Sequence, residues 1–501
     1  MTSQPPVSYE TVTAPPVRRP PEMSAITEVE VSPLDPARFR EALGDAFVHY
    51  EEGLAQASGL FDERAVWHVN STARGGGVAE LLQSLLAYAR GAGVDARWIV
   101  IGGNPEFFEI TKRIHNRLHG ADGDGGELGD EAREIYERTL AASTEELVAR
   151  VRPGDIVFLH DPQTAGMAAA LRERGTIVVW RCHVGLDVPN DVARSAWDFL
   201  RPYVEPADAF VFSRRSFVWD GIDEDRTWLV APSIDAFSPK NQELPDTAVR
   251  AILRTIGLGD GEEPTAAGRF TRVDGTPGRV DRAAELHQDG LIPTDATLIT
   301  QVSRWDSLKD PIGVLRGFTS ALADRPEAHL LLAGPSVAAV ADDPEGAGVL
   351  ADVIAERERL PAEERARVHL ACLPMDDIQE NAAMVNAIQR RSDIVVQKSF
   401  AEGFGLTVAE AMWKSRPVVA SARGGIQDQI TDRESGLLVQ DPTDLEEFGA
   451  ILAELVADPG MRERIGAAAH DRVRDEFLGS RHLLQYEQLL ADLLELSERE
   501  A

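Results

Sequence analysis

Cysteine is scarce in this sequence. Only Cys182 and Cys372 occur among its 501 residues, and each lies inside an apolar run far from the other. Two such residues provide no disulfide framework, and they lack the short spacing that zinc sites require. We therefore predict two buried free thiols and no cysteine-based metal site.

Positive charge is also scarce. The chain has 51 lysine and arginine residues against 83 aspartate and glutamate residues, which gives a formal net charge of −32 at pH 7. This excess of acidic residues argues against nucleic acid and anionic membrane as partners. An anionic substrate is compatible with it only if arginine, lysine and helix N-termini gather locally at the site.

Long hydrophobic runs and several catalytic motifs are missing. No apolar run reaches membrane-spanning length, and the N-terminus lacks the pattern of a secretion signal, so we expect a cytoplasmic protein with no membrane partner. The sequence has no G-x-S-x-G elbow, no H-E-x-x-H and no zinc spacing, so it gives no support to hydrolase or metalloenzyme functions.

The sequence does contain two successive series of short apolar strands with helical patterns between them. The first series is predicted at 65–70, 96–101, 155–160, 176–180 and 208–213. The second is predicted at 297–302, 328–333, 367–371, 392–396, 416–420 and 436–439. This rhythm predicts an α/β protein with two doubly wound, Rossmann-like domains, whose strand ends face a central cleft.

The domain limits follow from the same pattern. Residues 1–33 are rich in proline, serine and threonine, so we expect a disordered tail, followed by an N-terminal helical extension. In each domain we expect ligands at the carboxyl ends of the strands. The predicted segments after the tail are a helical extension at 34–60, an N-terminal domain at 61–245, a C-terminal domain at 246–478 with a linker or insertion at 255–290, and a C-terminal helix at 479–501 that could pack back on the first domain.

The stretch EGFGLTVAE, residues 402–410, follows the apolar run SDIVV and leads into a helical pattern. Gly403 and Gly405 allow a tight turn, after which the helix start presents free N–H groups to an anion. Glu402 and Glu410 bracket the turn. This arrangement suits a ligand with a central phosphate and hydroxyls at both ends, such as a sugar nucleotide. A glycine-punctuated loop with two solvated glutamates is the plain alternative.

Three further stretches follow predicted strand ends. In STARGGGVAE (71–80), three glycines leave a bare backbone that can approach a phosphate or sugar, or simply form a tight turn. It has neither the G-x-G-x-x-G spacing of a dinucleotide site nor the terminal Lys-Ser/Thr of a P-loop. In SRWDSLKD (303–310), Arg304 and Lys309 stand five residues apart and could neutralise a diphosphate, although they could equally be surface charges.

Asp161 and His183 also follow strands. A neutral histidine can donate a hydrogen bond to a sugar hydroxyl or a developing charge, and an aspartate can hold acceptor hydroxyls. A single histidine beside an apolar run is more often structural, and we interpret His68, His160 and His369 in that way.

These motifs, taken in order, resemble those of the family 4 retaining glycosyltransferases, which have the GT-B fold. Longer stretches, among them HVNSTARGGGVAELL, PEFFEITKRIHNRLHG, WRCH, APSIDAFSPKN and GGIQDQI, are similar to the trehalose glycosyltransferring synthases within that family. The related retaining trehalose phosphorylases share much of the pattern. The resemblance covers about residues 60–495 without the 255–290 stretch.

The resemblance implies a catalytic set of Arg304, Lys309, Glu402 and His183. The two cations would bind the donor's diphosphate and stabilise the leaving nucleotide. Glu402 would hold the donor glucose, and His183 would contact the transferring sugar. The implied donor-binding residues are Gly76, Gly77, Gly403, Phe404, Gly405, Leu406, Thr407 and Glu410, the last on the ribose. The implied acceptor-binding residues are Asp161 and Asn70.

The resemblance implies that UDP-glucose or ADP-glucose reacts with free glucose to form α,α-trehalose, with no metal and no cofactor. The alternatives are a trehalose phosphorylase, a family 4 enzyme with another acceptor and a non-catalytic sugar-nucleotide sensor. A homodimer is one possible oligomeric state.

Two positions differ from the family pattern near the implied site. Asp310 follows Lys309 where relatives often have glycine, and VGLD follows His183 where they tend to have IDLS.

Overall fold

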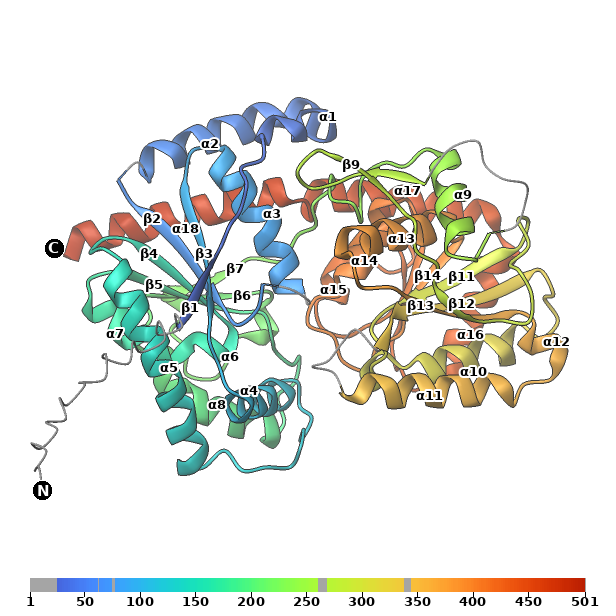
Figure 1. The fold of residues 1–501 in the computed structure, drawn as a ribbon, viewed down its shortest axis with the longest axis horizontal. Helices are drawn as coiled ribbons and strands as arrows, with labels where there is room; N and C mark the ends of the chain where they lie inside the picture. The colour runs from blue at the N-terminus through green and yellow to red at the C-terminus, as the bar shows by residue number, and fades with distance from the viewer. Residues whose placement is uncertain (1–24, 62, 74–76, 260–267, 338–343, 501) are drawn as a thin grey trace, which may run out of the picture.

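The computed structural model describes residues 25–500, apart from 62, 74–76, 260–267 and 338–343. Two α/β domains lie side by side, and each is built on a seven-stranded sheet (Figure 1). The predicted architecture of two doubly wound domains is confirmed.

The first sheet has the order β1-β3-β2-β4-β5-β6-β7, and every neighbouring pair except β1–β3 is parallel. The chain moves from β2 to β3 on one side and then to β4 on the other. The order therefore reverses between β2 and β4, which is where α/β sheets bind ligands. The strands are β1 (Ile26–Val29), β2 (Ala65–Asn70), β3 (Asp95–Ile101), β4 (Ile156–His160), β5 (Ile177–Cys182), β6 (Ala209–Phe212) and β7 (Thr227–Leu229).

Helices cover both faces of this sheet, because its strands are buried on both sides and read as continuous apolar runs. α4, α5, α7 and α8 pack on one face, and α2 packs on the other. The helices are η1 (Pro36–Phe39), α1 (Arg40–Leu43), η2 (Gly44–Ala46), α2 (Phe47–Leu60), α3 (Gly77–Gly91), α4 (Pro105–Leu118), α5 (Asp130–Arg150), α6 (Asp161–Thr164), η3 (Ala165–Met167), α7 (Ala168–Glu173), α8 (Asp191–Val204), η4 (Arg215–Phe217) and η5 (Glu224–Arg226).

The second sheet has the order β10-β13-β12-β11-β14-β15-β16, and every neighbouring pair except β10–β13 is parallel. Its order reverses between β11 and β14. The strands are β10 (Glu285–His287), β11 (Thr297–Val302), β12 (Ala328–Pro335), β13 (Val368–Leu373), β14 (Ile394–Gln397), β15 (Val418–Ser421) and β16 (Leu437–Val439), and a separate hairpin contains β8 (Arg269–Thr271) and β9 (Pro277–Arg279).

The second domain also has helices on both faces of its sheet. α13 packs with α9 on one face, and α10, α11 and α16 pack on the other. The helices are α9 (Asp246–Thr255), η6 (Ser307–Lys309), α10 (Pro311–Ala321), α11 (Pro344–Glu358), α12 (Ala362–Arg365), α13 (Ile378–Arg391), α14 (Leu406–Trp413), α15 (Ile426–Gln429), α16 (Leu445–Ala457), α17 (Pro459–Glu476) and α18 (Gly479–Glu500).

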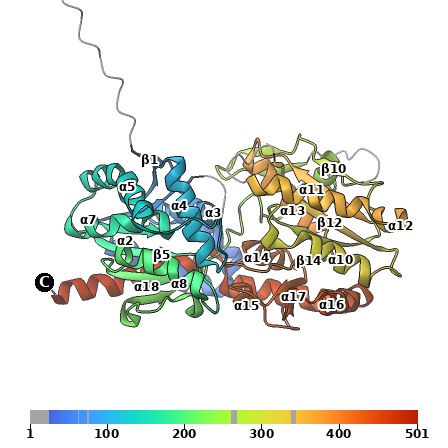
Figure 2. The same ribbon diagram turned by 90° about the horizontal axis from the view of Figure 1, so that it is seen from below.

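The last helix, α18, returns to the first domain and packs against α2 and α3. Tyr486 stacks on Phe158 of β4 with ring centroids 4.9 Å apart, and His482 Nδ1 lies 3.1 Å from the Ser233 hydroxyl. Figure 2 shows α15, α16, α17 and α18 along the same side of the two domains. The C-terminal helix therefore links the domains through buried contacts.

The N-terminal end of the described chain differs from the expected tail. Disorder up to residue 33 is wrong for 26–29, which form the edge strand β1, antiparallel to β3. The backbone N–H of Ala25 donates to Glu146 of α5 over 2.7 Å, and Ile26 is buried. A four-residue edge strand is stabilised by its neighbours rather than by its own pattern, so the sequence gives no sign of it. Residues 1–24 lie outside the described chain.

The 255–290 stretch also differs from the linker or insertion that the sequence predicts. It contains the β8–β9 hairpin and β10, which extends the second sheet at its edge. Phe270 and Val280 are buried in the core beside α9 and α13. The backbone N–H groups of Asp281 and Arg282 donate to Glu380 on α13. Strands of three residues among glycines and charges are too short to be recognised from periodicity.

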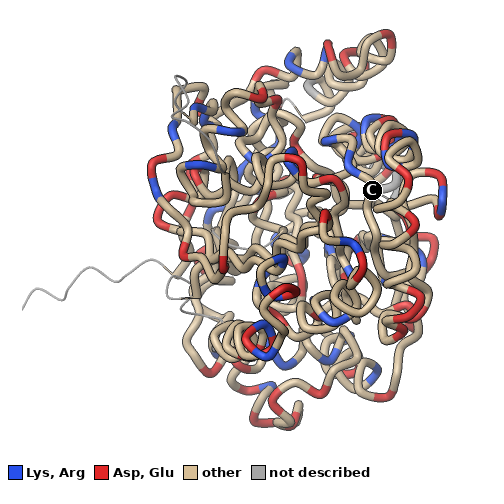
Figure 3. The backbone as a smooth tube through the Cα atoms, turned by 90° about the vertical axis from the view of Figure 1, so that its right-hand side faces the viewer, with Lys and Arg blue, Asp and Glu red and all other residues tan. Residues whose placement is uncertain are grey.

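Several compositional expectations can be compared with the structure. Cys182 and Cys372 are both buried and unpaired, as predicted. Figure 3 shows acidic and basic residues interleaved along the backbone. Within the described part of the chain, no helix is long and apolar enough to cross a membrane.

Candidate active site

Lys309 and Glu402 meet at the point where the order of the second sheet reverses. Lys309 ends η6, after β11, and Glu402 follows the neighbouring strand β14. The Lys309 ammonium lies 2.7 Å from Glu402 Oε2, and the two side chains are only 16% and 12% exposed. Two residues 93 positions apart in sequence therefore form one charged pair at a ligand-binding position of the fold.

Three polar residues that sequence reasoning did not assign surround this pair. The Ser399 hydroxyl and the Gln397 amide donate to Glu402 Oε2 over 3.3 and 3.4 Å. The Gln301 amide donates to the Lys309 carbonyl over 2.7 Å. Gln397 ends the otherwise apolar strand β14, and that contrast was a signal available in the sequence. Gln301 lies one residue before the end of β11, which also contains two threonines, so it did not stand out.

Arg304 lies in the same loop and pairs with Asp306 over 3.1 Å. Its side chain is about half exposed, so it can reach a ligand. Burial lowers the pKa of His115 on α4 to about 3, and the Arg304 charge contributes to that shift. Arg304 therefore lies within electrostatic reach of the first domain.

Asp310 adopts the left-handed backbone conformation, with φ 47°, which glycine adopts without strain. Its Oδ1 accepts the N–H of Gly313 over 3.0 Å and caps α10, and its other oxygen pairs with the fully buried Lys398. Lys398 compensates the Asp310 charge, so this departure from the family pattern does not leave an unpaired negative charge beside Lys309.

The EGFG turn is built from close backbone contacts. Gly405 has φ 81° and forms the N-cap of α14. Gly424, with φ 54°, packs so tightly that a Cβ would lie 1.7 Å from the Glu402 carbonyl oxygen, and the Gly425 N–H donates to the Gly403 carbonyl over 2.9 Å. The Phe404 ring is buried and lies 5.8 Å from the Phe477 ring. Phe404 therefore contributes its backbone, not its ring, to the turn.

Glu410 lies inside α14 and is only 4% exposed. Its Oε1 lies 3.4 Å from Lys240, which also contacts Glu80 of α3 over 2.8 Å. Burial opposes the charge on Lys240, but Glu410 and Glu80 outweigh that effect and the pKa of Lys240 is raised. Glu410, the residue expected to bind the ribose, is therefore part of an ion-pair network that joins the two domains.

The N-terminal ends of α3 and α14 face each other. A Cβ on Gly77 would lie 3.0 Å from Leu406 Cδ1, so glycine permits the close approach of the two helices. Leu406 and Thr407 begin α14, whose N-terminus has no side-chain cap among the described residues, so its first backbone N–H groups can bind an anion. Gly76 lies outside the described residues.

Asp161 is the first residue after β4 and has φ 61°, a conformation that costs free energy for a residue other than glycine. Its Oδ1 accepts the backbone N–H of His183 over 2.7 Å. Burial raises the pKa of Asp161 to about 7, although the His183 N–H and the Arg181 charge oppose the rise. A strained, desolvated carboxylate at the end of a strand is typical of a functional site.

This shift predicts a pH dependence of stability. The ordinary pKa of Asp161 is 3.8, so the unfolded chain releases this proton near pH 4, whereas the folded protein keeps it until about pH 7. The contribution of Asp161 to the free energy of unfolding therefore falls as the pH rises from about 4 to about 7. Asp161→Asn should gain stability relative to the wild type between pH 5 and pH 8, as measured by urea unfolding. A stability difference that stays constant with pH would contradict the shift, because the histidines titrate equally in both proteins.

Asn70 ends β2 and is buried. Its Oδ1 accepts the indole N–H of Trp98 over 2.9 Å, and its amide donates to the Thr72 carbonyl over 2.7 Å. Both ends of the amide therefore make contacts that shape the loop after β2. Asn70, the residue expected to bind the acceptor, thus uses its side chain for hydrogen bonds within the first domain.

His183 and His119 bring the first domain to the EGFG turn. A Cβ on Gly403 would lie 3.3 Å from the His183 carbonyl oxygen and 4.0 Å from His119 Cε1. Burial lowers the pKa of His119 to about 4, and the Lys309 charge lowers it further. Sequence reasoning did not assign a role to His119, although it lies in PEFFEITKRIHNRLHG, one of the stretches that resemble the family.

A second set of contacts joins the domains beside this turn. Asp187 accepts the N–H of Gly424 over 2.9 Å and the Gln427 amide over 3.0 Å. Arg214, after β6, pairs with Asp187 over 2.9 Å and with Asp428 over 3.2 Å, and it donates to the Gly424 carbonyl. Asp187 is the last residue of VGLD, the stretch after His183 that differs from the family pattern, so this stretch contributes to the contact between the domains.

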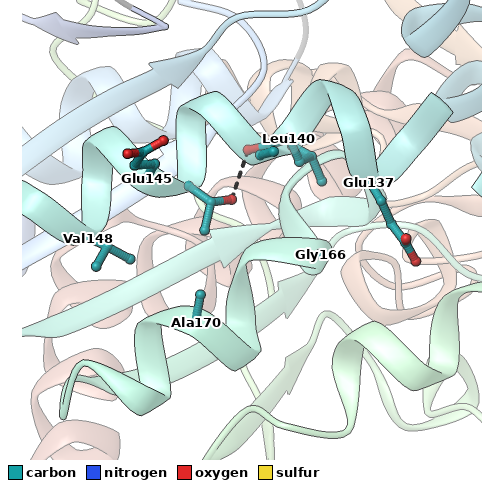
Figure 4. Close-up of a pocket in the computed structure, with 8 residues that line it drawn as sticks. Glu137, Leu140, Glu145, Val148, Gly166 and Ala170 are labelled. Carbon is teal, nitrogen blue, oxygen red and sulfur yellow. Dashed lines mark hydrogen bonds between the residues drawn. The ribbon is translucent and has the colours of Figure 1, made fainter. Parts of the chain in front are cut away.

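Two further observations concern metal ions and cavities. In the described residues, no group of three or more histidine, cysteine, aspartate or glutamate side chains is arranged to hold a metal ion. A cavity of about 380 Å³ lies between α5 and α7, with Glu137, Leu140 and Ala170 among its lining residues (Figure 4). None of the predicted site residues lines this cavity.

Two domains with mainly parallel sheets meet at two helix N-termini, beside a lysine–glutamate pair at the strand ends of the second sheet. These features are those of a GT-B glycosyltransferase. The family description "Glycosyl transferases group 1" matches residues 283–472, and "Trehalose synthase, N-terminal domain" matches residues 68–219. An α,α-trehalose-phosphate synthase (UDP-forming) from Burkholderia vietnamiensis has the same fold, with a TM-score of 0.63 at 15% identity over 86% of this chain and 98% of that one. The GT-B prediction is confirmed.

Two curated relatives narrow the family. The trehalose synthase of Pyrococcus horikoshii is 35% identical over 430 residues, which cover 86% of this chain and 90% of that protein. The trehalose phosphorylase of Pleurotus pulmonarius is 26% identical over 81% of this chain but only 54% of its own length. This chain belongs to the trehalose synthase family of glycosyltransferases.

Proposed function

We propose that the protein is a retaining glucosyltransferase that forms α,α-trehalose from UDP-glucose or ADP-glucose and free glucose. The observation that carries the proposal is the Lys309–Glu402 pair in a chain of the trehalose synthase family. The next residue, Gly403, lies against the His183 carbonyl at the domain contact. Such a site offers positive charge and helix N-termini for a diphosphate beside carboxylates for sugar hydroxyls.

In the proposed reaction, Arg304, Lys309 and the N–H groups at the start of α14 bind the donor's diphosphate. Glu402 holds the glucose, Glu410 the ribose and Asp161 the acceptor hydroxyls. The acceptor oxygen attacks the anomeric carbon from the face that the diphosphate leaves. A new C–O bond forms, the bond to phosphate breaks, and the departing phosphate oxygen takes the acceptor proton. This path requires no protein nucleophile, so catalysis is mainly positioning and charge stabilisation.

The test is to incubate the purified protein with glucose and each of a panel of sugar nucleotides, with and without EDTA. We expect trehalose and free nucleoside diphosphate in equal amounts from one or both glucose donors, and no effect of the chelator. Absence of a disaccharide with every donor would overturn the proposal. A disaccharide formed only with another acceptor sugar would change the assigned acceptor.

A retaining trehalose phosphorylase is the second candidate, because the Pleurotus relative matches 81% of this chain. That enzyme class would convert trehalose and inorganic phosphate to α-glucose 1-phosphate and glucose. Incubation with trehalose and either phosphate or a nucleoside diphosphate separates the two functions. We expect glucose release with the nucleoside diphosphate and none with phosphate.

Arg214→Ala should raise the KM for the sugar nucleotide by about 10-fold, because it removes two contacts between the domains, the ion pair with Asp428 and the hydrogen bond to the Gly424 carbonyl. Steady-state kinetics measures this effect. The neighbouring Arg215 is 64% exposed and pairs only with Glu224 among the described residues, so Arg215→Ala is a matched control with unchanged KM. Equal KM values for the two variants would mean that the Arg214 contacts do not support donor binding.

A further inference from the structure

Three histidines form a hydrogen-bonded row across the first sheet, at the strands where its order reverses. His68 lies on β2, His160 ends β4 and His183 follows β5. His68 Nδ1 lies 3.0 Å from His160 Nε2, and His160 Nδ1 lies 3.0 Å from His183 Nε2. The neighbouring rings are nearly parallel, with interplanar angles of 27° and 15°. The row runs from the sheet interior to the domain contact.

The row is neutral near pH 7. His68 and His160 are almost fully buried. Burial lowers the pKa of His68 to about 3 and holds those of His160 and His183 well below their ordinary value. The Arg181 charge on β5 and His482 on α18 also disfavour a proton on His183. Each ring therefore carries one proton.

Counting protons shows that the rings are coupled. Each of the two N···N hydrogen bonds needs one proton, and three neutral rings hold three, so the third proton lies at one end of the row. Either all three rings carry their proton on Nδ1, or all carry it on Nε2. In the first state His183 offers an N–H at its remaining nitrogen, and in the second it offers a lone pair.

The buried end of the row favours the first state. His68 stacks on Phe158 with ring centroids 4.6 Å apart and lies 6.2 Å from the Tyr486 ring. The Tyr486 hydroxyl has no hydrogen-bond partner in the described chain, and no described group accepts a hydrogen bond from His68 Nε2. His68 is only 2% exposed, so a proton on that nitrogen would be a donor without a described protein acceptor beside aromatic rings, which is costly.

We propose that His160 and His68 are positioning residues that hold His183 as its Nδ1–H tautomer, so that His183 donates a hydrogen bond into the site. The inference rests on the proposed function, in which His183 contacts the transferring sugar. His183 is the partly exposed member of the row, and its carbonyl oxygen lies against Gly403. A fixed N–H suits a sugar oxygen or the charge that develops on the leaving phosphate.

Kinetics of His160 variants tests the positioning role. His160→Phe keeps an aromatic ring in the stack and removes both hydrogen bonds, so kcat should fall roughly 10-fold with a smaller change in KM. His160→Gln should recover part of the loss, because its amide can accept from one ring and donate to the other. His369→Phe is the matched control. It breaks the His329–His369 contact, also 3.0 Å, in the other domain and should leave kcat unchanged.

The tautomers can be read without any substrate by nitrogen-15 NMR of histidine-labelled protein, where protonated and unprotonated ring nitrogens have distinct shifts. We expect protonated Nδ1 on all three rings in the wild type, and a mixture at His183 in His160→Phe. A wild-type His183 protonated on Nε2, or an unchanged kcat in His160→Phe, would overturn the inference. Because the spectrum needs no turnover, failure of the proposed function and failure of this inference are distinguishable.

Discussion

Replacing Lys309 by alanine should lower kcat by about 10²- to 10³-fold in the proposed reaction. The ammonium group is 2.7 Å from Glu402, and its side chain is only 16% exposed. A charge held in such a site needs no reorganisation when the diphosphate leaves, so its loss falls on the transition state more than on donor binding. We therefore expect a fall in kcat that exceeds the rise in KM, measured by steady-state nucleotide release.

A matched control for this variant is available on α10. Arg316 is 57% exposed and pairs with Glu356 over 2.6 Å, so Arg316→Ala removes a positive charge outside the site and should keep full activity. Lys309→Arg should recover little activity, because a planar guanidinium cannot occupy the position of a compact ammonium. A Lys309→Ala protein that kept wild-type kcat would refute the phosphate assignment.

Loss of folding could imitate this result, and Glu402 provides the means to separate the two effects. Without Lys309, the 12% exposed carboxylate keeps only the neutral donors of Ser399 and Gln397 among the described residues, so the melting temperature should fall. Adding Glu402→Gln removes the unpaired charge. The double variant should regain stability. A loss of activity in Lys309→Ala that persists well below its own melting temperature would then be assigned to chemistry, not to unfolding.

The parallel strands could be predicted from sequence because they are buried on both faces. AVWHVN is predicted at 65–70, and β2 spans those residues with every position buried. TLITQV likewise matches β11 at 297–302. Since strand ends of a parallel sheet meet at one edge, the loops that contain Lys309 and Glu402 could be expected near each other before their 2.7 Å contact was known.

The contacts between the domains could not be predicted in the same way. Asp187 and Arg214 look like surface charges in the sequence, and only the docking of one domain on the other brings them to Gly424. The row of histidines is a similar case. His68 and His160 were each interpreted as structural because each is single in its own strand. Their relation to His183 depends on the order β2-β4-β5, which no local pattern encodes.

Asp161 carries the second large expected effect. Its carboxylate accepts the His183 N–H over 2.7 Å, and its backbone is held at φ 61°. Asparagine tolerates this conformation and retains an oxygen for the same hydrogen bond, but it lacks the negative charge that Asp161 carries above about pH 7 and offers to an acceptor hydroxyl. Asp161→Asn should therefore lower kcat/KM for glucose by about 10²-fold while the KM for the sugar nucleotide stays unchanged.

Alanine at the same position separates charge from backbone placement. Asp161→Ala loses the charge and also the contact that holds His183, so kcat/KM for glucose should fall by about 10³-fold. If Asp161→Asn kept the wild-type kcat/KM while Asp161→Ala was inactive, Asp161 would serve only to orient His183. Equal losses in the two variants would mean that the charge alone matters. The expected order, with both variants impaired and Ala more so, requires that one carboxylate holds the acceptor and fixes the loop that faces it.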